Sequence, residues 1–363
     1  MVNKIGISIY PNRASFEENK QYLEVARKLG FKRVFTSLLE LNDNQTLNEF
    51  KEINLFAKKL GLEVEIDINP RLFKKLDISY NDLSFFKDMG AWGIRLDQGF
   101  TGKEEAQMTY NPYDLKIEIG MSSTPERIRQ ILQYNPKIEN LMGSHNFYPH
   151  RYTGLSKEHF DYCNDVYHQC SVNSAAFITS QVGKQGAAIM NEGLCTLELH
   201  RDLSIDSQFK FYQLTNSVND VLIGNAFASQ IELKKISDCM SAPYPSLKVN
   251  IEKGITSLEQ EVLTENLHYY RGDVSDYLIR STLTRVKYRD RDFPAHNCNA
   301  TIQKGDVLID NNGYGQYKGE TQIALRSFPN NGRINVVGRI DSDDVYLLDY
   351  LKPWSHFNFE VVD

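Results

Sequence analysis

The feature that most constrains the fold is a regular alternation of short apolar segments and amphipathic stretches over roughly the first 240 residues. Apolar segments typical of buried strands occur at residues 4–10, 33–40, 62–69, 92–97, 115–121, 140–147, 174–180 and 219–225. Between several of them apolar residues recur at helical spacing, as in Tyr22, Val25, Ala26 and Leu29. Eight strand–helix units of this total length predict an α/β fold, the (β/α)8 or TIM barrel.

The alternative is an open, doubly wound α/β sheet, which would produce a similar alternation. That fold usually begins with a glycine-rich phosphate loop after the first strand, whereas here the first strand runs into Tyr10, Pro11 and Asn12. The sequence therefore favours the barrel. Ser229 and Glu232 form a capping-box pattern that predicts the start of the last barrel helix.

The sequence pattern changes near Pro243, beyond which helical stripes become rare. β-branched and aromatic runs then alternate with turn residues, at residues 278–286, 305–310, 321–325, 334–338 and 345–348. This pattern predicts a small antiparallel β-barrel or sandwich. We expect the (β/α)8 barrel to span residues 1–243 and the all-β domain to span residues 244–363.

Composition narrows the function classes. The formal net charge of −6 argues against nucleic acid or an anionic membrane as a partner, because both select a basic face. No apolar run approaches the roughly 18 residues of a membrane span. The five cysteines are odd in number and form no CxxC pair, which is typical of free thiols in a reducing compartment. We therefore expect a cytoplasmic protein.

Carboxylates recur at the ends of successive predicted strands. Side chains alternate along a strand, so parity predicts which of them face the barrel interior. Parity places Asp67 inward on the third strand, Arg95 and Asp97 inward on the fourth, and Glu118 inward on the fifth. Glu40 ends the second strand. Because the strand ends meet at one rim, we expect these carboxylates to converge there, with Arg95 as an internal partner for one of them.

Such a cluster indicates chemistry, because crowded like charges cost free energy unless they are paired or used. Carboxyl groups whose pKa values are pushed apart suit general acid–base work on a glycosidic bond. They would equally suit a divalent metal. From their adjacency we predict Asp97 and Glu118 as the catalytic pair, with Glu40 and Asp67 as alternatives.

The sixth strand ends in residues that could contact a substrate. His145 and Asn146 stand at this strand end, and Tyr148 follows them as a candidate wall residue. A neutral imidazole at a barrel rim can bind substrate, although a strand-end histidine often has a structural role instead. We include these side chains among the candidate binding residues.

A second feature follows the seventh and eighth strands. Lys184 lies in a glycine-punctuated loop, Gly224 and Asn225 end the eighth strand, and Ser229 starts the next helix. Barrels of this type often hold phosphate with these loops and a helix N-terminus. The sequence therefore predicts a phosphate pocket here, with Arg151 as a further candidate from the loop after strand six.

Several segments resemble one known family. They are residues 35–40, 95–100, 144–156, 193–201, 223–229 and 310–320. In this order they resemble the bacterial 6-phospho-N-acetylmuramidase family, over the whole chain. Two rim positions depart from the pattern expected of the family: Gly120-Met121 stands where an asparagine-containing segment is expected, and His150 where an arginine is expected.

The resemblance implies a (β/α)8 barrel followed by a cyclophilin-like β-barrel. It also implies an intracellular glycoside hydrolase that acts in cell-wall turnover. The implied substrate is the phosphorylated amino-sugar disaccharide N-acetylmuramic acid 6-phosphate–N-acetylglucosamine. No cofactor is expected.

Two alternatives from other classes stay open. A metal-dependent sugar-phosphate isomerase or epimerase would use Glu40, Asp67, Glu118 and His145 as ligands. A non-catalytic regulator would bind the sugar phosphate without turnover. We predict no metal requirement, because the sequence contains no strong ligand motif such as HExxH. Sensitivity to a chelator separates the isomerase from a glycosidase.

Overall fold

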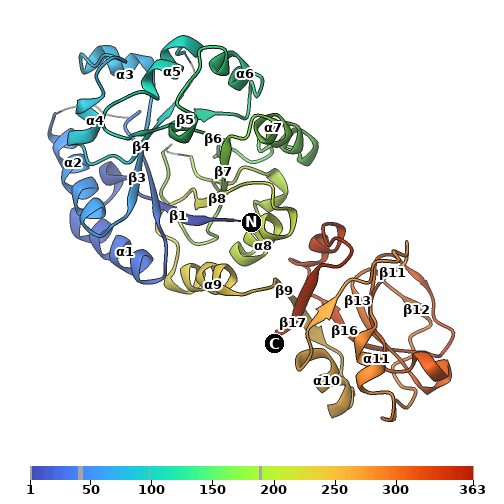
Figure 1. The fold of residues 1–363 in the computed structure, drawn as a ribbon. Coiled ribbons are helices and arrows are strands. Elements are labelled where there is room, and N and C mark those ends of the chain that lie inside the picture. The colour runs from blue at the N-terminus through green and yellow to red at the C-terminus, as the bar shows by residue number, and fades with distance from the viewer. Residues whose placement is uncertain (1, 40–43, 98, 188–189, 363) are drawn as a thin grey trace. The chain divides into compact units, whose positions relative to one another are not determined.

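The computed structural model describes residues 2–39, 44–97, 99–187 and 190–362, which form two compact units that part near residue 240 (Figure 1). In these ranges eight parallel strands close into a barrel in chain order. The strands are β1 Lys4–Ser8, β2 Arg33–Ser37, β3 Glu63–Ile68, β4 Gly93–Leu96, β5 Lys116–Gly120, β6 Leu141–Ser144, β7 Asn173–Ile178 and β8 Asp220–Ile223. The predicted (β/α)8 fold is confirmed, and each predicted strand segment contains the observed strand or nearly all of it.

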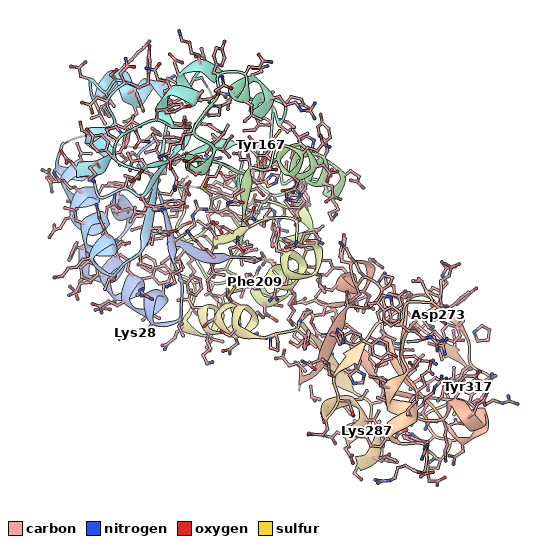
Figure 2. All side chains as sticks on the ribbon, in the orientation of Figure 1. Lys28, Tyr167, Phe209, Asp273, Lys287 and Tyr317 are labelled. Carbon is pink, nitrogen blue, oxygen red and sulfur yellow. The ribbon has the colours of Figure 1, made fainter. Side chains whose placement is uncertain are left out.

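Helices surround this barrel (Figure 1). They are α1 Phe16–Lys28, α2 Asn44–Lys59, α3 Pro70–Lys75, α4 Ser84–Asp88, α5 Gly102–Met108, α6 Arg127–Leu132, α7 Lys157–Gln169, α8 Ile205–Thr215 and α9 Gln230–Ser241, with short 3-10 turns at Pro11–Arg13, Ile138–Asn140 and Glu198–His200. Tyr167 of α7 and Phe209 of α8, labelled in Figure 2, are fully buried. None of the helices in the described ranges has the length and apolarity of a membrane span.

Helix α1 illustrates how local sequence sets an element's limits. Ser15 accepts a hydrogen bond from the backbone N–H of Glu18, and the Glu18 carboxylate accepts one from the backbone N–H of Ser15. This capping box begins the helix. Tyr22 and Ala26 face the core, and Gly30 ends the helix with φ of +87°, a conformation that glycine adopts without steric cost.

Strands β3, β4 and β5 have opposite chemistry on their two faces. Residues that face the helices are apolar and fully buried, for example Ile66 and Ile94. Inward positions are polar on β3, β4 and β5. The strand register places Asp67 beside Arg95, and Arg95 beside Glu118. Asp67, Arg95 and Glu118, which parity predicts to face inward, therefore lie next to one another on adjacent strands.

The second unit is a mixed β domain. Its strands are β9 Ser246–Ile251, β10 His268–Tyr269, β11 Leu278–Ser281, β12 Thr301–Ile302, β13 Asp306–Asp310, β14 Thr321–Ala324, β15 Phe328–Pro329, β16 Ile334–Ile340 and β17 His356–Val362. One sheet has the order β10-β17-β9-β16-β13-β14-β11, and its ends approach each other through a hydrogen bond from Arg271 N to Arg280 O of 3.0 Å. The domain is therefore nearly closed.

Three details of this domain differ from the prediction. The pairing of β9 with β17 is parallel, so the sheet is mixed rather than antiparallel. Residues 345–348 belong to a 3-10 turn at Val345–Asp349, and the segment 278–286 ends in helix α11, Leu283–Lys287. Helix α10, Ser257–Thr264, completes the domain with a 3-10 segment at Asn312–Tyr317. Short apolar runs fit a helical turn as well as a strand, which explains these differences.

Candidate active site

A first buried cluster surrounds Arg33, which starts β2 and is fully buried inside the barrel. Its guanidinium donates to Glu65 of β3, to Glu118 of β5 at 2.7 Å and to Asp220 of β8 at 3.0 Å. The side chains of these carboxylates are at most 8% exposed. We call Arg33, Glu65, Glu118 and Asp220 the deep cluster.

The pKa values of Glu65 and Glu118 in the deep cluster shift in opposite directions. Burial raises the pKa of Glu65 well above its ordinary value, and the neighbouring Glu118 carboxylate adds to this rise against the opposing effect of Arg33. Burial is the largest single influence on Glu118 and acts to raise its pKa. The charges of Arg33 and Arg95 and the hydrogen bonds with Glu65 and Ser144 together outweigh it, so the net shift is downward. Of these two carboxyl groups, Glu65 therefore binds a proton more readily. One guanidinium cannot neutralise the surrounding carboxylates if all of them are ionised.

A second cluster surrounds Arg95 of β4. Its guanidinium donates to Asp67 Oδ1 at 2.9 Å, to Ser144 Oγ of β6 at 2.9 Å and to the side-chain oxygen of Asn146. Ser37 of β2 donates to Asp67 Oδ2 at 3.2 Å. We call Arg95, Asp67, Ser37, Ser144 and Asn146 the upper cluster. Like the deep cluster it is built on one arginine, but it includes residues beyond the ends of the strands.

Asp97 follows β4 directly, and its backbone N–H donates to Ile68 O at 2.9 Å. The residue is half-buried, and within the described ranges no hydrogen bond reaches its carboxylate. Burial raises the pKa of Asp67 despite its ion pair with Arg95, and the charge of Asp97 raises it further. Asp67 and Asp97 thus form an interacting pair at the carboxyl ends of β3 and β4. Glu40, the remaining predicted carboxylate, lies outside the described residues.

His145 lies outside both clusters. Ser144 points inward to Arg95, so the next residue points outward, and the His145 ring packs on Phe160 of α7 with centroids 4.6 Å apart. The histidine is fully buried, and burial lowers its pKa to about 3. It is therefore a neutral core residue with no surface open to a ligand. Tyr148, by contrast, is partly exposed beyond the end of β6.

Aromatic residues fill the opposite side of the barrel interior. Phe35 of β2, Phe177 of β7 and Phe147 form a triangle with ring centroids 5.1–5.7 Å apart. Tyr10 and Leu222 pack into the same apolar cluster. The sequence analysis did not single out this wall, although Phe35 has the same inward parity as Arg33. The interior is therefore polar around Arg33 and Arg95 and apolar around these aromatic rings.

A polar pocket of about 360 Å³ opens beside the loops that follow β6, β7 and β8. Its basic lining residues include Arg151, Lys184 and Arg201, and its acidic ones include Glu192 and Asp202. Lys184 is exposed and has no ion pair or hydrogen bond to another described residue. Two predicted phosphate ligands, Arg151 and Lys184, thus come together here from different loops.

The other two residues predicted to bind phosphate, Gly224 and Asn225, have structural roles. The N–H of Gly224 donates to Ile178 O at 2.8 Å, and a Cβ on this glycine would lie 2.3 Å from Leu194 O. Asn225 is buried and clamps the next loop, with bonds of 2.8 Å to Ser180 N, Ser180 O and Gly183 O. Gly224 is therefore required by close packing, and Asn225 holds the loop that leads to Lys184.

The N-terminus of α9 is occupied by the protein's own carboxylate. Glu232 accepts hydrogen bonds from Ser229 N at 2.9 Å, Gln181 N at 2.8 Å and Ser180 Oγ at 2.8 Å. The predicted capping box is confirmed, and it uses N–H groups that a phosphate would otherwise need. The N–H groups of Val182 and Gly183 donate to Ser180 Oγ. Among the described lining residues, the side-chain cations therefore offer the strongest attraction for an anion.

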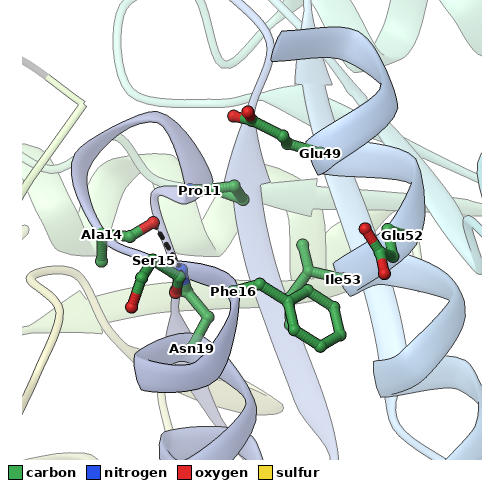
Figure 3. Close-up of a pocket in the computed structure, with 8 residues that line it drawn as sticks. All are labelled: Pro11, Ala14, Ser15, Phe16, Asn19, Glu49, Glu52 and Ile53. Atoms are coloured by element: carbon green, nitrogen blue, oxygen red, sulfur yellow. Dashed lines mark hydrogen bonds between the residues drawn. The ribbon is translucent and has the colours of Figure 1, made fainter. Parts of the chain in front are cut away.

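A smaller pocket of about 180 Å³ lies between α1 and α2 (Figure 3). Its lining includes the carboxylates of Glu49 and Glu52 and the Phe16 ring, without a lysine or arginine among the described lining residues. The nearby Asn19 amide is turned toward Ala14, to whose carbonyl it donates at 3.3 Å. Its charge makes this pocket unsuitable for a phosphate.

The metal ligand set of the isomerase alternative does not assemble from the described residues. His145 faces α7, Glu118 bonds Arg33, and Asp67 bonds Arg95. No group of three or more His, Cys, Asp or Glu side chains in the described ranges is arranged to hold a metal ion. These carboxylates are instead paired with guanidinium groups.

Comparisons with known proteins are consistent with this architecture. Family models described as 6-phospho-N-acetylmuramidase, N-terminal and C-terminal, match residues 5–238 and 245–360. A solved structure of an uncharacterized B. cereus protein is 41% identical, with a TM-score of 0.90 over 99% of this chain and 100% of that one. A conserved Enterococcus faecalis protein shares the fold at 22% identity, with a TM-score of 0.77 over 99% and 96% of the two chains. No curated protein matches the chain.

Proposed function

Because the chain belongs to the 6-phospho-N-acetylmuramidase family, we propose that it hydrolyses the bond between N-acetylmuramic acid 6-phosphate and N-acetylglucosamine. The observation that carries this proposal is the presence of two complementary features at the carboxyl ends of the barrel strands. One is the Asp67–Asp97 pair, and the other is the pocket with Lys184 and Arg151. A phosphosugar glycosidase needs carboxyl groups for the bond and cations for the phosphate.

In this proposal Asp97 and Asp67 are the catalytic residues, and Glu118 is not. Asp97 has the exposure a substrate contact needs, and the raised pKa of Asp67 suits a carboxyl that delivers a proton to the leaving oxygen. Glu118 is 1% exposed and bonded to Arg33, which supports a structural role. Arg95 is a positioning residue, because it holds Asp67 and Asn146 together.

Asp97 then acts as a base on water, as a nucleophile, or as the group that orients the 2-acetamido group of the substrate. Direct attack by water inverts the configuration of the released N-acetylmuramic acid 6-phosphate, whereas the other two routes retain it. Rapid proton NMR of the first anomer formed separates inversion from retention.

The phosphate of the substrate is held by Lys184 and Arg151. Asn146 of the upper cluster and Tyr148 are partly exposed and precede Arg151 of this pocket in the chain, and the proposal uses them as binding residues. The substrate is a phosphorylated fragment of the cell wall, so the reaction belongs to peptidoglycan recycling in the cytoplasm. The free cysteines of the described chain agree with a reducing compartment.

The test is product analysis with the phosphorylated and unphosphorylated disaccharides. We expect cleavage of the phosphorylated sugar alone, and full activity in a chelator. Equal cleavage of both sugars would remove the anion pocket from the proposal. Loss of activity in a chelator, restored by a divalent ion, would favour the sugar-phosphate isomerase. Binding without turnover would favour the non-catalytic regulator.

A further inference from the structure

The cations of the polar pocket differ in how firmly they are already engaged. Arg201 donates to Glu198 and to the carbonyl oxygens of Tyr148, Glu192 and Gly193, and its side chain is 1% exposed. It is therefore committed to holding the loops together. Lys184 makes no such contacts among the described residues.

Arg151 is engaged less firmly than Arg201 but more firmly than Lys184. Its guanidinium forms a two-pronged pair with Asp202, with Nη1–Oδ2 at 2.6 Å and Nη2–Oδ1 at 2.9 Å. The Arg151 side chain is 35% exposed and the Asp202 side chain is 71% exposed. The backbone N–H of Arg151 donates to Glu192 at 2.9 Å, which fixes the main chain. The guanidinium itself pairs with Asp202 at the solvent-exposed surface.

We propose that Asp202 is a specificity-determining residue, which occupies Arg151 in the free protein and gives way to a phosphate dianion. A carboxylate and a phosphate present similar pairs of oxygens to the planar guanidinium, so either can accept hydrogen bonds from both Nη1 and Nη2. The identity of the anion as the substrate's phosphate rests on the proposed function. The exchange itself rests on the geometry of this pair.

The charge of the incoming anion decides whether the exchange is favourable. A monoanion would replace Asp202 like for like, and would also meet the repulsion of Asp202 and Glu192 in the same pocket. A dianion interacts with Arg151 and Lys184 together and gains more than it displaces. Exposed ion pairs contribute little, so Asp202 can turn into water at low cost. The aspartate therefore excludes carboxylates and chloride without excluding phosphate.

The experiment is isothermal titration of the full chain with inorganic phosphate and with acetate, at a mildly alkaline pH where phosphate is a dianion. The variants are Asp202→Asn and Lys184→Ala. The matched control is Asp238→Asn, which removes an exposed carboxylate paired with Lys234 on α9. We expect Asp202→Asn to bind phosphate about two- to fivefold more tightly, and to gain acetate binding that the wild type lacks. We expect the control to match the wild type and Lys184→Ala to weaken phosphate binding.

Unchanged or weaker phosphate binding in Asp202→Asn would overturn the proposal, because Asp202 would then position Arg151 rather than compete for it. Acetate binding by the wild type would also overturn it. The assay separates this inference from the proposed function. Phosphate binding with the expected response, in a protein that cleaves no disaccharide, supports the exchange and contradicts the glycosidase. If the protein cleaves only the 6-phosphorylated disaccharide but Asp202→Asn leaves phosphate binding unchanged, the result supports the glycosidase and contradicts the exchange.

Discussion

The deep and upper clusters of the barrel are each built on one arginine but differ in the residues that surround it. Arg33 is fully buried, and its partners Glu65, Glu118 and Asp220 are buried around it. Arg95 bonds Asp67 and Asn146, which lead to the exposed ends of the strands. An ion pair links the two clusters, from Arg95 Nε to Glu118 Oε1 at 3.8 Å.

The difference teaches that an inward carboxylate is not by itself a catalytic one. In the deep cluster, charge neutralises charge where water and substrate have no access, and the result is a structural network. In the upper cluster Arg95 likewise holds one carboxylate, that of Asp67. The neighbouring Asp97 carboxylate accepts no hydrogen bond from a described residue. Access sets Asp97 apart from the inward carboxylates, because the Asp67 side chain is 6% exposed and therefore as buried as that of Asp220, at 8%.

The largest expected effect comes from removing the cation of the deep cluster. Arg33→Met leaves buried carboxylates without a counter-charge, and we expect it to lower the free energy of unfolding by about 3–5 kcal/mol. Urea denaturation followed by Trp92 fluorescence measures this directly, because the Arg33 guanidinium lies 5.2 Å from the centre of that ring. Arg129→Met, at an exposed site on α6, is the control. Equal stability of the two variants would show that the deep cluster is not structural.

The next effect tests the upper cluster. We expect Asp97→Asn and Asp67→Asn each to lower turnover about a hundredfold or more, with the fold retained, because general acid–base catalysis is lost. Glu118→Gln should lower the free energy of unfolding while turnover of the folded fraction changes far less. Steady-state kinetics and urea denaturation on each variant measure both quantities. A hundredfold loss in Glu118→Gln at unchanged stability, with Asp67→Asn active, would return the catalytic role to Glu118.

A smaller effect is expected at the phosphate pocket. Charge-assisted hydrogen bonds contribute about 1.5–3 kcal/mol, so Lys184→Ala should lower kcat/KM for the phosphorylated disaccharide roughly tenfold to a hundredfold. Lys234→Ala, at an exposed lysine of α9, is the matched control. If Lys184→Ala cleaves the phosphorylated sugar as well as the control does, Lys184 has no part in binding it.

The smallest effect concerns a strand-end group outside both clusters. Burial lowers the pKa of His145 from about 6.5 to about 3, so the folded protein resists its protonation. The stability this provides is present above the unfolded pKa and is lost as the pH falls from about 6.5 toward 3. In His145→Asn the free energy of unfolding should fall less steeply as the pH is lowered, by up to about 1.4 kcal/mol per pH unit. We expect the turnover of this variant to stay within a few-fold of the wild-type value. Urea denaturation at neutral and acidic pH measures the slope, and an unchanged slope would contradict a buried neutral histidine.

Local patterns in the sequence were enough to predict the barrel. Strand segments, the helical stripe of α1 and the capping box at Ser229 and Glu232 depend on neighbours within a few residues, and each is present in the structure. Parity also placed Asp67, Arg95 and Glu118 inside the barrel. The parallel pairing of β9 with β17 joins segments about a hundred residues apart, and no local pattern reports it.

What the sequence by itself determined is which face of each strand a side chain takes, because alternation along a strand is a local property. Only the tertiary structure decided how deep each inward group lies and which charge reaches it. Glu118 bonds an arginine from β2, Glu232 reaches from α9 to the loop after β7, and Arg151 meets Asp202 across two loops. These contacts depend on the stagger of strands around a closed barrel and on loop paths, which bring together residues far apart in the chain.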